Sequence, residues 1–99
     1  MNQRAQTLNR LRRQIDRIDQ SLLHLLNRRA SAALRIGTLK KQQGLPIFDA
    51  KREGNVLRRM IHTNSGPLSE TAVREIFRRI LRENRWLQKG NVRARGKPC

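Results

Sequence analysis

The sequence predicts an all-α fold of three helices in one small domain, and three observations support this prediction. Apolar residues recur at alternating intervals of three and four along the first part of the chain, as on one face of an α-helix. The turn-forming segments Gly44-Leu45-Pro46 and Asn64-Ser65-Gly66-Pro67 divide the chain into three helical stretches. A length of 99 residues supports a single hydrophobic core.

A long first helix is expected from about Ala5 to Gln43, where Gly37 is the only glycine or proline. Its apolar residues have the spacing of a coiled-coil seam: Leu8, Leu11, Ile15, Ile18, Leu22 and Leu25. At about 1.5 Å per residue this helix is roughly 55–60 Å long, which exceeds the diameter of a compact domain of this size. Because only 36% of the residues are hydrophobic and Cys99 is the only cysteine, oligomerisation is the expected route to stability.

Two shorter helices are expected to follow. The second begins at Asp49, whose carboxylate can cap the free amide groups of the first turn. The third begins after Ser69, with Leu68 and Val73 spaced as a hydrophobic staple, and ends near Gln88. Their apolar faces comprise Val56, Leu57, Met60 and Ile61, and then Val73, Ile76, Phe77, Ile80 and Leu81. The folded domain is thus predicted over residues 1–88, and residues 89–99 are predicted to form a basic, disordered tail.

The net charge of +16 predicts a field that attracts anions, whether nucleic acid, acidic lipid or a small polycarboxylate. The chain has no run of about 18 apolar residues and no apolar N-terminal segment, so a cytoplasmic location is expected and no membrane association. His24 and His62 are isolated from other ligand-type residues, so no metal site is predicted. No glycine-rich phosphate loop and no nucleophile–base arrangement is evident.

Seven polar residues extend the apolar faces of the helices: Arg29 and Lys40 on the first, Asp49, Arg52 and Glu53 on the second, and Asn84 and Gln88 on the third. Arg29 and Lys40 share one face about 16 Å apart. Because buried charges are costly unless paired, these residues predict a shared polar pocket whose positive excess suits a small dicarboxylate. The alternative interpretation places them at helix ends, where polar groups reach water.

The third helix also carries five arginines, which are interpreted as its solvent-facing side: Arg74, Arg78, Arg79, Arg82 and Arg85. Trp86 is interpreted as a packing residue near the helix end. The net charge and these arginines leave a basic helical nucleic-acid-binding protein open as an alternative. Aromatic stacking platforms are absent, however, and such a protein has no need of Glu53 or Gln88 on an apolar face.

Three segments together resemble the all-α chorismate mutases. They are Leu11-Arg12-x-x-Ile15-x-x-Ile18-Asp19 with Leu22-x-x-Leu25-Leu26-x-x-Arg29 and Ile36-Gly37-x-x-Lys40, then Pro46-Ile47-x-Asp49-x-x-Arg52-Glu53, and finally Ile76-Phe77-Arg78-x-Ile80 with Asn84 and Gln88. The resemblance covers residues 8–88. It implies an isomerase of the shikimate pathway and aromatic amino acid biosynthesis that converts chorismate to prephenate by a [3,3] rearrangement without a cofactor. It also implies an intertwined helical homodimer whose active sites are shared between the chains.

The resemblance further implies how the substrate is gripped. Arg29, together with Arg12 from the partner chain, would bind the two carboxylates of chorismate. Arg12 precedes Arg29 by 17 residues, about 100° away from its face of the helix, which agrees with a role in the other site. Lys40 would donate hydrogen bonds to the ether oxygen and to a carboxylate, and Gln88 would donate to the same ether oxygen.

The remaining implied roles concern the ring hydroxyl. Glu53 and the backbone near Asp49 would hold it, and Arg52 would position Glu53 and add to the positive field. Asn84 takes the place that a serine has in many relatives, beside a substrate carboxylate. Two further alternatives stay open at this point: an isochorismate-pyruvate lyase of the same fold, and an interaction module that regulates another enzyme of the pathway.

Overall fold

The computed structural model describes residues 2–91 and contains three α-helices, which confirms the predicted fold class. They are α1 (Gln3–Gln43), α2 (Ala50–Thr63) and α3 (Glu70–Gln88). Most of the predicted basic tail, residues 92–99, lies outside the described residues. No described helix combines the length and apolar character needed to cross a bilayer.

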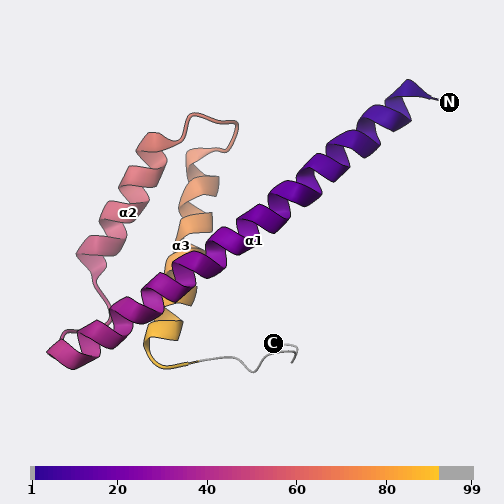
Figure 1. Cartoon of the computed structure of the whole chain (residues 1–99). Coiled ribbons are helices and arrows are strands. Elements are labelled where there is room, and N and C mark those ends of the chain that lie inside the picture. Colours follow the sequence, from indigo (N-terminus) through magenta and orange to yellow (C-terminus); the bar gives the residue numbers. More distant parts are fainter. Residues whose placement is uncertain (1, 92–99) are drawn as a thin grey trace.

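The long helix α1 determines the shape of the molecule. Its C-terminal half lies beside the other two helices, whereas its N-terminal half extends well beyond them (Figure 1). The molecule is therefore elongated, with extents of 64 × 36 × 18 Å. Helix α3 packs against both α1 and α2.

Local capping interactions fix where each helix starts and stops. Gly44 takes a left-handed conformation (φ 69°) that ends α1, a conformation for which glycine is favoured. The carboxylate of Asp49 accepts a hydrogen bond from the Arg52 amide at 2.9 Å, and the Ser69 hydroxyl accepts one from the Ala72 amide at 3.0 Å. Both predicted caps are thus confirmed.

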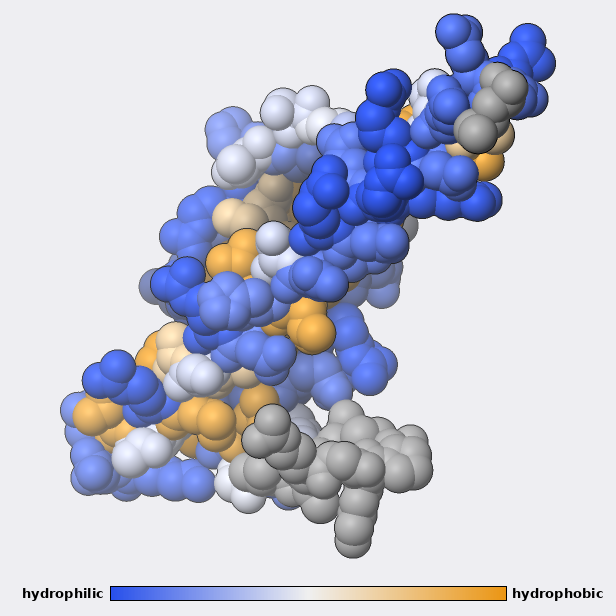
Figure 2. All heavy atoms as spheres, turned by 45° about the vertical axis from the view of Figure 1, so that its right-hand side comes forward, coloured by the Kyte–Doolittle hydropathy of each residue, from blue (hydrophilic) through white to orange (hydrophobic). Residues whose placement is uncertain are grey.

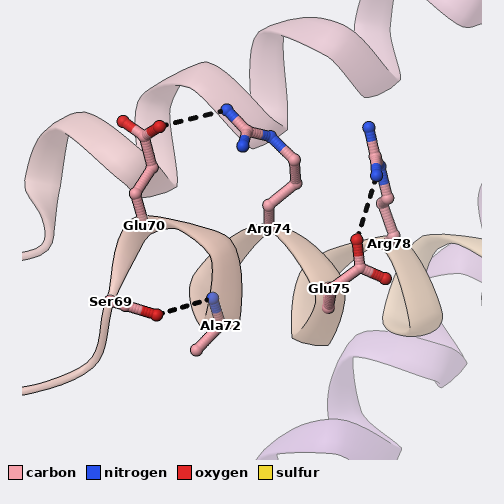
Figure 3. A network of polar contacts seen from close by, with 6 residues as sticks. All are labelled: Ser69, Glu70, Ala72, Arg74, Glu75 and Arg78. Carbon is pink, nitrogen blue, oxygen red and sulfur yellow. Dashed lines mark hydrogen bonds and ion pairs between the residues drawn. The ribbon is translucent and has the colours of Figure 1, made fainter.

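The exposed side of α3 begins with ion pairs within the helix. Glu70 pairs with Arg74 and Glu75 with Arg78, just after the Ser69 cap (Figure 3). Arg79 similarly pairs with Glu83 one turn later. These arginines lie on the solvent side of the helix, as predicted for them.

The hydrophobic core is small. The buried apolar residues are Ala33, Val56, Val73 and Leu81, and among the described residues no side chain is less than 2% exposed. Hydrophilic residues cover most of the face in Figure 2, and apolar atoms show mainly in its middle and at its lower left. The seam residues of α1 from Leu8 to Leu25 are between 47% and 55% exposed, so this chain alone leaves the predicted seam uncovered.

Candidate active site

A cavity of about 450 Å³ is lined by residues of all three helices and of the segment that precedes α2. All seven polar residues that the sequence assigns to a shared pocket line it, so their predicted convergence is confirmed. The complete lining is Arg29, Ala32, Ala33, Ile36, Lys40, Ile47, Asp49, Arg52, Glu53, Val56, Leu81, Asn84, Arg85 and Gln88. The cavity size suits a small organic ligand.

Helix α1 supplies one wall through residues spaced at intervals of three and four, which puts Arg29, Ala33, Ile36 and Lys40 on one side of the helix. The Arg29 guanidinium donates a hydrogen bond to the side-chain oxygen of Asn84, which is buried. The Lys40 ammonium donates to the carbonyl oxygen of Ile47 at 3.1 Å. An ammonium group has three N–H donors, so Lys40 can bind a ligand while this bond holds it.

Helix α3 supplies the amide of Gln88. Its Nε2 donates to the carbonyl oxygen of Ala33 at 3.0 Å, and a second N–H on the same nitrogen remains for a ligand. Gly37 is buried directly against this residue: a Cβ at Gly37 would lie 3.1 Å from the Cα, Cβ and Cγ atoms of Gln88. The absence of a side chain at Gly37 therefore allows Gln88 to lie this close to α1.

The start of α2 supplies Asp49, Arg52 and Glu53. The carboxylate of Asp49 is engaged in capping α2, so this side chain has a structural task as well as a place in the cavity wall. The Glu53 carboxylate accepts two hydrogen bonds from Nη1 of Arg85, at 2.9 and 2.8 Å, whereas the resemblance implied Arg52 as the residue that positions Glu53.

Arg85 corrects one interpretation of the sequence. It was expected on the solvent-facing side of α3, but it lines the cavity, is about a quarter exposed and pairs with Glu53. Its position four residues after the buried Leu81 places both on one face of the helix, and this spacing was the signal that could have identified it.

The cavity wall carries a surplus of positive charge. Arg29, Lys40, Arg52 and Arg85 face only two acidic side chains, Asp49 and Glu53. Burial lowers the pKa of the Arg29 guanidinium below its usual value; the charge of Arg52 lowers it further, and that of Glu53 opposes both effects. An anionic ligand would relieve this excess by pairing with Arg29 and Arg52.

Arg12 is the predicted site residue that the chain does not bring to its own cavity. It is exposed on the projecting half of α1, 17 residues before Arg29 and so about 25 Å away along the helix. Its contribution to a site of a second chain stays a prediction. Among the described residues, no group of three or more histidine, cysteine or acidic side chains is placed to hold a metal ion.

Comparisons with known proteins point to one family. Residues 11–89 match the family described as chorismate mutase type II. A chorismate mutase of Methanocaldococcus jannaschii is 32% identical over 85 residues, covering 83% of this chain and 84% of that protein. A bifunctional chorismate mutase/prephenate dehydratase of Aquifex aeolicus is 38% identical over 78 residues, covering 75% of this chain.

The chain spans about a fifth of the length of such bifunctional relatives, 22% for the Aquifex protein. Among solved structures, chorismate mutase (Form II) from Thermus thermophilus superposes with a TM-score of 0.84 at 30% identity, covering 88% of this chain and 99% of that one. The family match extends over most of the described helices and includes every residue that lines the cavity. The chain belongs to the chorismate mutase type II family.

Proposed function

We propose that this chain catalyses the rearrangement of chorismate to prephenate. The observation that carries the proposal is the convergence of seven predicted polar residues, from three helices, on one cavity with a surplus of positive charge. Chorismate carries two carboxylates, which suit the guanidinium groups of Arg29 and Arg52. The family to which the chain belongs and the chorismate mutase of similar length support the same activity.

The reaction breaks a C–O bond and forms a C–C bond in one pericyclic step, so it needs neither a nucleophile nor a proton transfer. An enzyme accelerates it by holding the substrate in its folded, reactive conformation and by stabilising the negative charge that grows on the ether oxygen. Lys40 and Gln88 are suited to that second task. Each is fixed by one hydrogen bond to a backbone carbonyl oxygen and retains further N–H donors for the ether oxygen.

Glu53 and Asn84 are assigned to substrate orientation. Glu53 can accept a hydrogen bond from the ring hydroxyl, because a carboxylate held by one arginine nitrogen keeps unused lone pairs. Asn84 holds the Arg29 guanidinium through its side-chain oxygen, which leaves its NH₂ group as a donor to a substrate carboxylate.

We infer that the active form is a homodimer in which α1 of each chain covers the other. The half-exposed seam from Leu8 to Leu25 supports this assembly, since apolar seams of this spacing are ordinarily buried against a second helix. In such a dimer Arg12 of the partner subunit would provide a further carboxylate-binding guanidinium. Because Arg12 would then serve the site of the other chain, its distance from the cavity of its own chain is explained.

The test follows the loss of chorismate absorbance with purified protein and identifies the product by chromatography. Conversion to prephenate is expected, and Lys40→Ala and Arg29→Ala should each lower the rate about a hundredfold or more. Lys41→Ala is the matched control, because Lys41 has the same charge but is exposed and lies outside the cavity wall.

Near-normal turnover by either cavity variant would contradict the site assignment. No conversion by the folded wild-type protein would contradict the function itself. Release of pyruvate from isochorismate at a higher rate than prephenate formation would instead identify the lyase of the same fold.

A further inference from the structure

Arg85 lies in the last turn of α3, follows the buried Asn84 in the sequence and lines the cavity. Its guanidinium contacts two other segments of the chain. Nη1 donates to both carboxylate oxygens of Glu53 in the first turn of α2, and Cζ lies 4.7 Å from the ring centroid of Phe48 in the segment before that helix. A guanidinium held on one side by a carboxylate and on another by an aromatic face has a fixed position.

The ion pair between Arg85 and Glu53 is more shielded from solvent than the other described ion pairs. The two side chains are only 25% and 23% exposed, whereas each of the other three described ion pairs has at least one partner more than half exposed. Shielding strengthens the attraction between two charges and makes an unpaired charge more costly. An ionised Glu53 without a cationic partner would therefore be unfavourable at this position.

Two other arginines in the cavity wall could serve as that partner. Arg29 is held by the neutral side chain of Asn84, and the described ion pairs include neither Arg29 nor Arg52. Glu53 is already close enough to Arg29 for its charge to raise the pKa of that guanidinium. Without Arg85, the carboxylate of Glu53 would be drawn to Arg29 or Arg52 and would occupy the groups that an anionic substrate needs.

We propose that Arg85 is a positioning residue that holds Glu53 away from Arg29 and Arg52, so that both guanidinium groups stay available to a dicarboxylate. This inference rests on the proposed function. It assigns Arg85 a task that is performed through Glu53 rather than on the substrate. Binding of the dicarboxylate should therefore depend on Arg85 only while residue 53 carries a negative charge.

The experiment compares Arg85→Leu in two backgrounds, wild type and Glu53→Gln. In the wild-type background, Arg85→Leu should raise KM for chorismate about tenfold, with a smaller fall in kcat, because Glu53 then competes with the substrate for the arginines. In the Glu53→Gln background the same substitution should change KM less than about twofold, since a neutral amide does not compete. Arg82→Leu, which removes one positive charge from the exposed side of α3, is the matched control and should leave KM unchanged.

Calorimetric titration with prephenate compares the affinity of Arg85→Leu for a dicarboxylate in the two backgrounds without any turnover. Failure of the proposed activity can therefore be distinguished from failure of the positioning role. Weaker prephenate binding by Arg85→Leu that is restored in the double variant supports the positioning role, whether or not the protein turns over chorismate. An equal loss of affinity in both backgrounds would mean that Arg85 acts directly on the ligand. Unchanged affinity in Arg85→Leu would equally overturn the proposal.

Discussion

Replacing Gly37 with alanine tests whether the close approach of α1 and α3 sets the position of Gln88. The new Cβ would lie 3.1 Å from the Cα, Cβ and Cγ atoms of Gln88, whereas ordinary van der Waals contact starts at 3.4 Å. Because one of these atoms belongs to the backbone, the last turn of α3 has to move by a few tenths of an ångström. Alanine stabilises the interior of a helix by about 1 kcal/mol relative to glycine. Overpacking of the contact would destabilise the fold by about 1–3 kcal/mol.

The two effects together predict that Gly37→Ala lowers the free energy of unfolding by about 0–2 kcal/mol. Turnover should fall more clearly, by about tenfold in kcat/KM, because a misplacement of about 1 Å in a catalytic group can cost a hundredfold. Urea denaturation at fixed protein concentration and chorismate consumption measure the two quantities.

Gly54→Ala is the matched control for this experiment. The three atoms nearest to a Cβ at Gly54 belong to the guanidinium end of Arg58, the first at 3.3 Å, and this flexible group can shift aside. The control should gain about 1 kcal/mol in stability and retain its activity. If Gly37→Ala behaves like Gly54→Ala in both measurements, the contact with Gln88 does not control the site.

Three further predictions concern the caps, the ether-oxygen donor and the assembly. Ser69→Ala should lower the free energy of unfolding by about 1 kcal/mol in urea denaturation while kcat stays unchanged, because the hydroxyl caps α3 at a distance from the cavity; unchanged stability would mean that the cap is energetically silent. Gln88→Glu should give a rate that rises as pH falls, since a carboxyl group donates a hydrogen bond only when protonated, and a flat pH–rate profile would exclude Gln88 as an ether-oxygen donor. When the Arg12→Ala and Lys40→Ala proteins are mixed in equal amounts, unfolded and refolded together, about a quarter of wild-type activity should return. About half of the dimers formed then contain one chain of each variant, and one of the two sites in each such dimer has both residues intact. No recovery in a mixture that contains mixed dimers would contradict shared sites.

The sequence predicted those features that depend on local chemistry and on helical spacing. Asp49 and Ser69 cap their helices because each oxygen meets an amide only three residues away. Arg29 and Lys40 face the same cavity because eleven residues return nearly to the same side of a helix. The predicted staple between Leu68 and Val73 stays a prediction; Val73 is buried, and Leu68 is half exposed.

The role of Arg85 could not be read from its neighbours in the sequence. Its partner Glu53 lies 32 residues earlier, and only the packing of α2 against α3 brings the two together. Arg85 also follows four other arginines on the same helix, and those with described carboxylate partners pair within α3. Composition alone therefore gave it the same interpretation as its neighbours. Arg12 presents the opposite case, since its predicted task needs a second chain.

The position of Gln88 at the last residue of α3 would make the proposed activity sensitive to the fraying of a helix end. Terminal turns open and close with much smaller free energies than whole domains, and each such opening would withdraw the amide from the cavity. The closing bonds are those from Lys89 to the Arg85 carbonyl at 3.1 Å and from Gly90 to the Leu87 carbonyl at 2.9 Å. Warming should thus reduce turnover over a range in which circular dichroism still reports nearly full helix content, and amide exchange at residues 88–90 should accelerate over that same range.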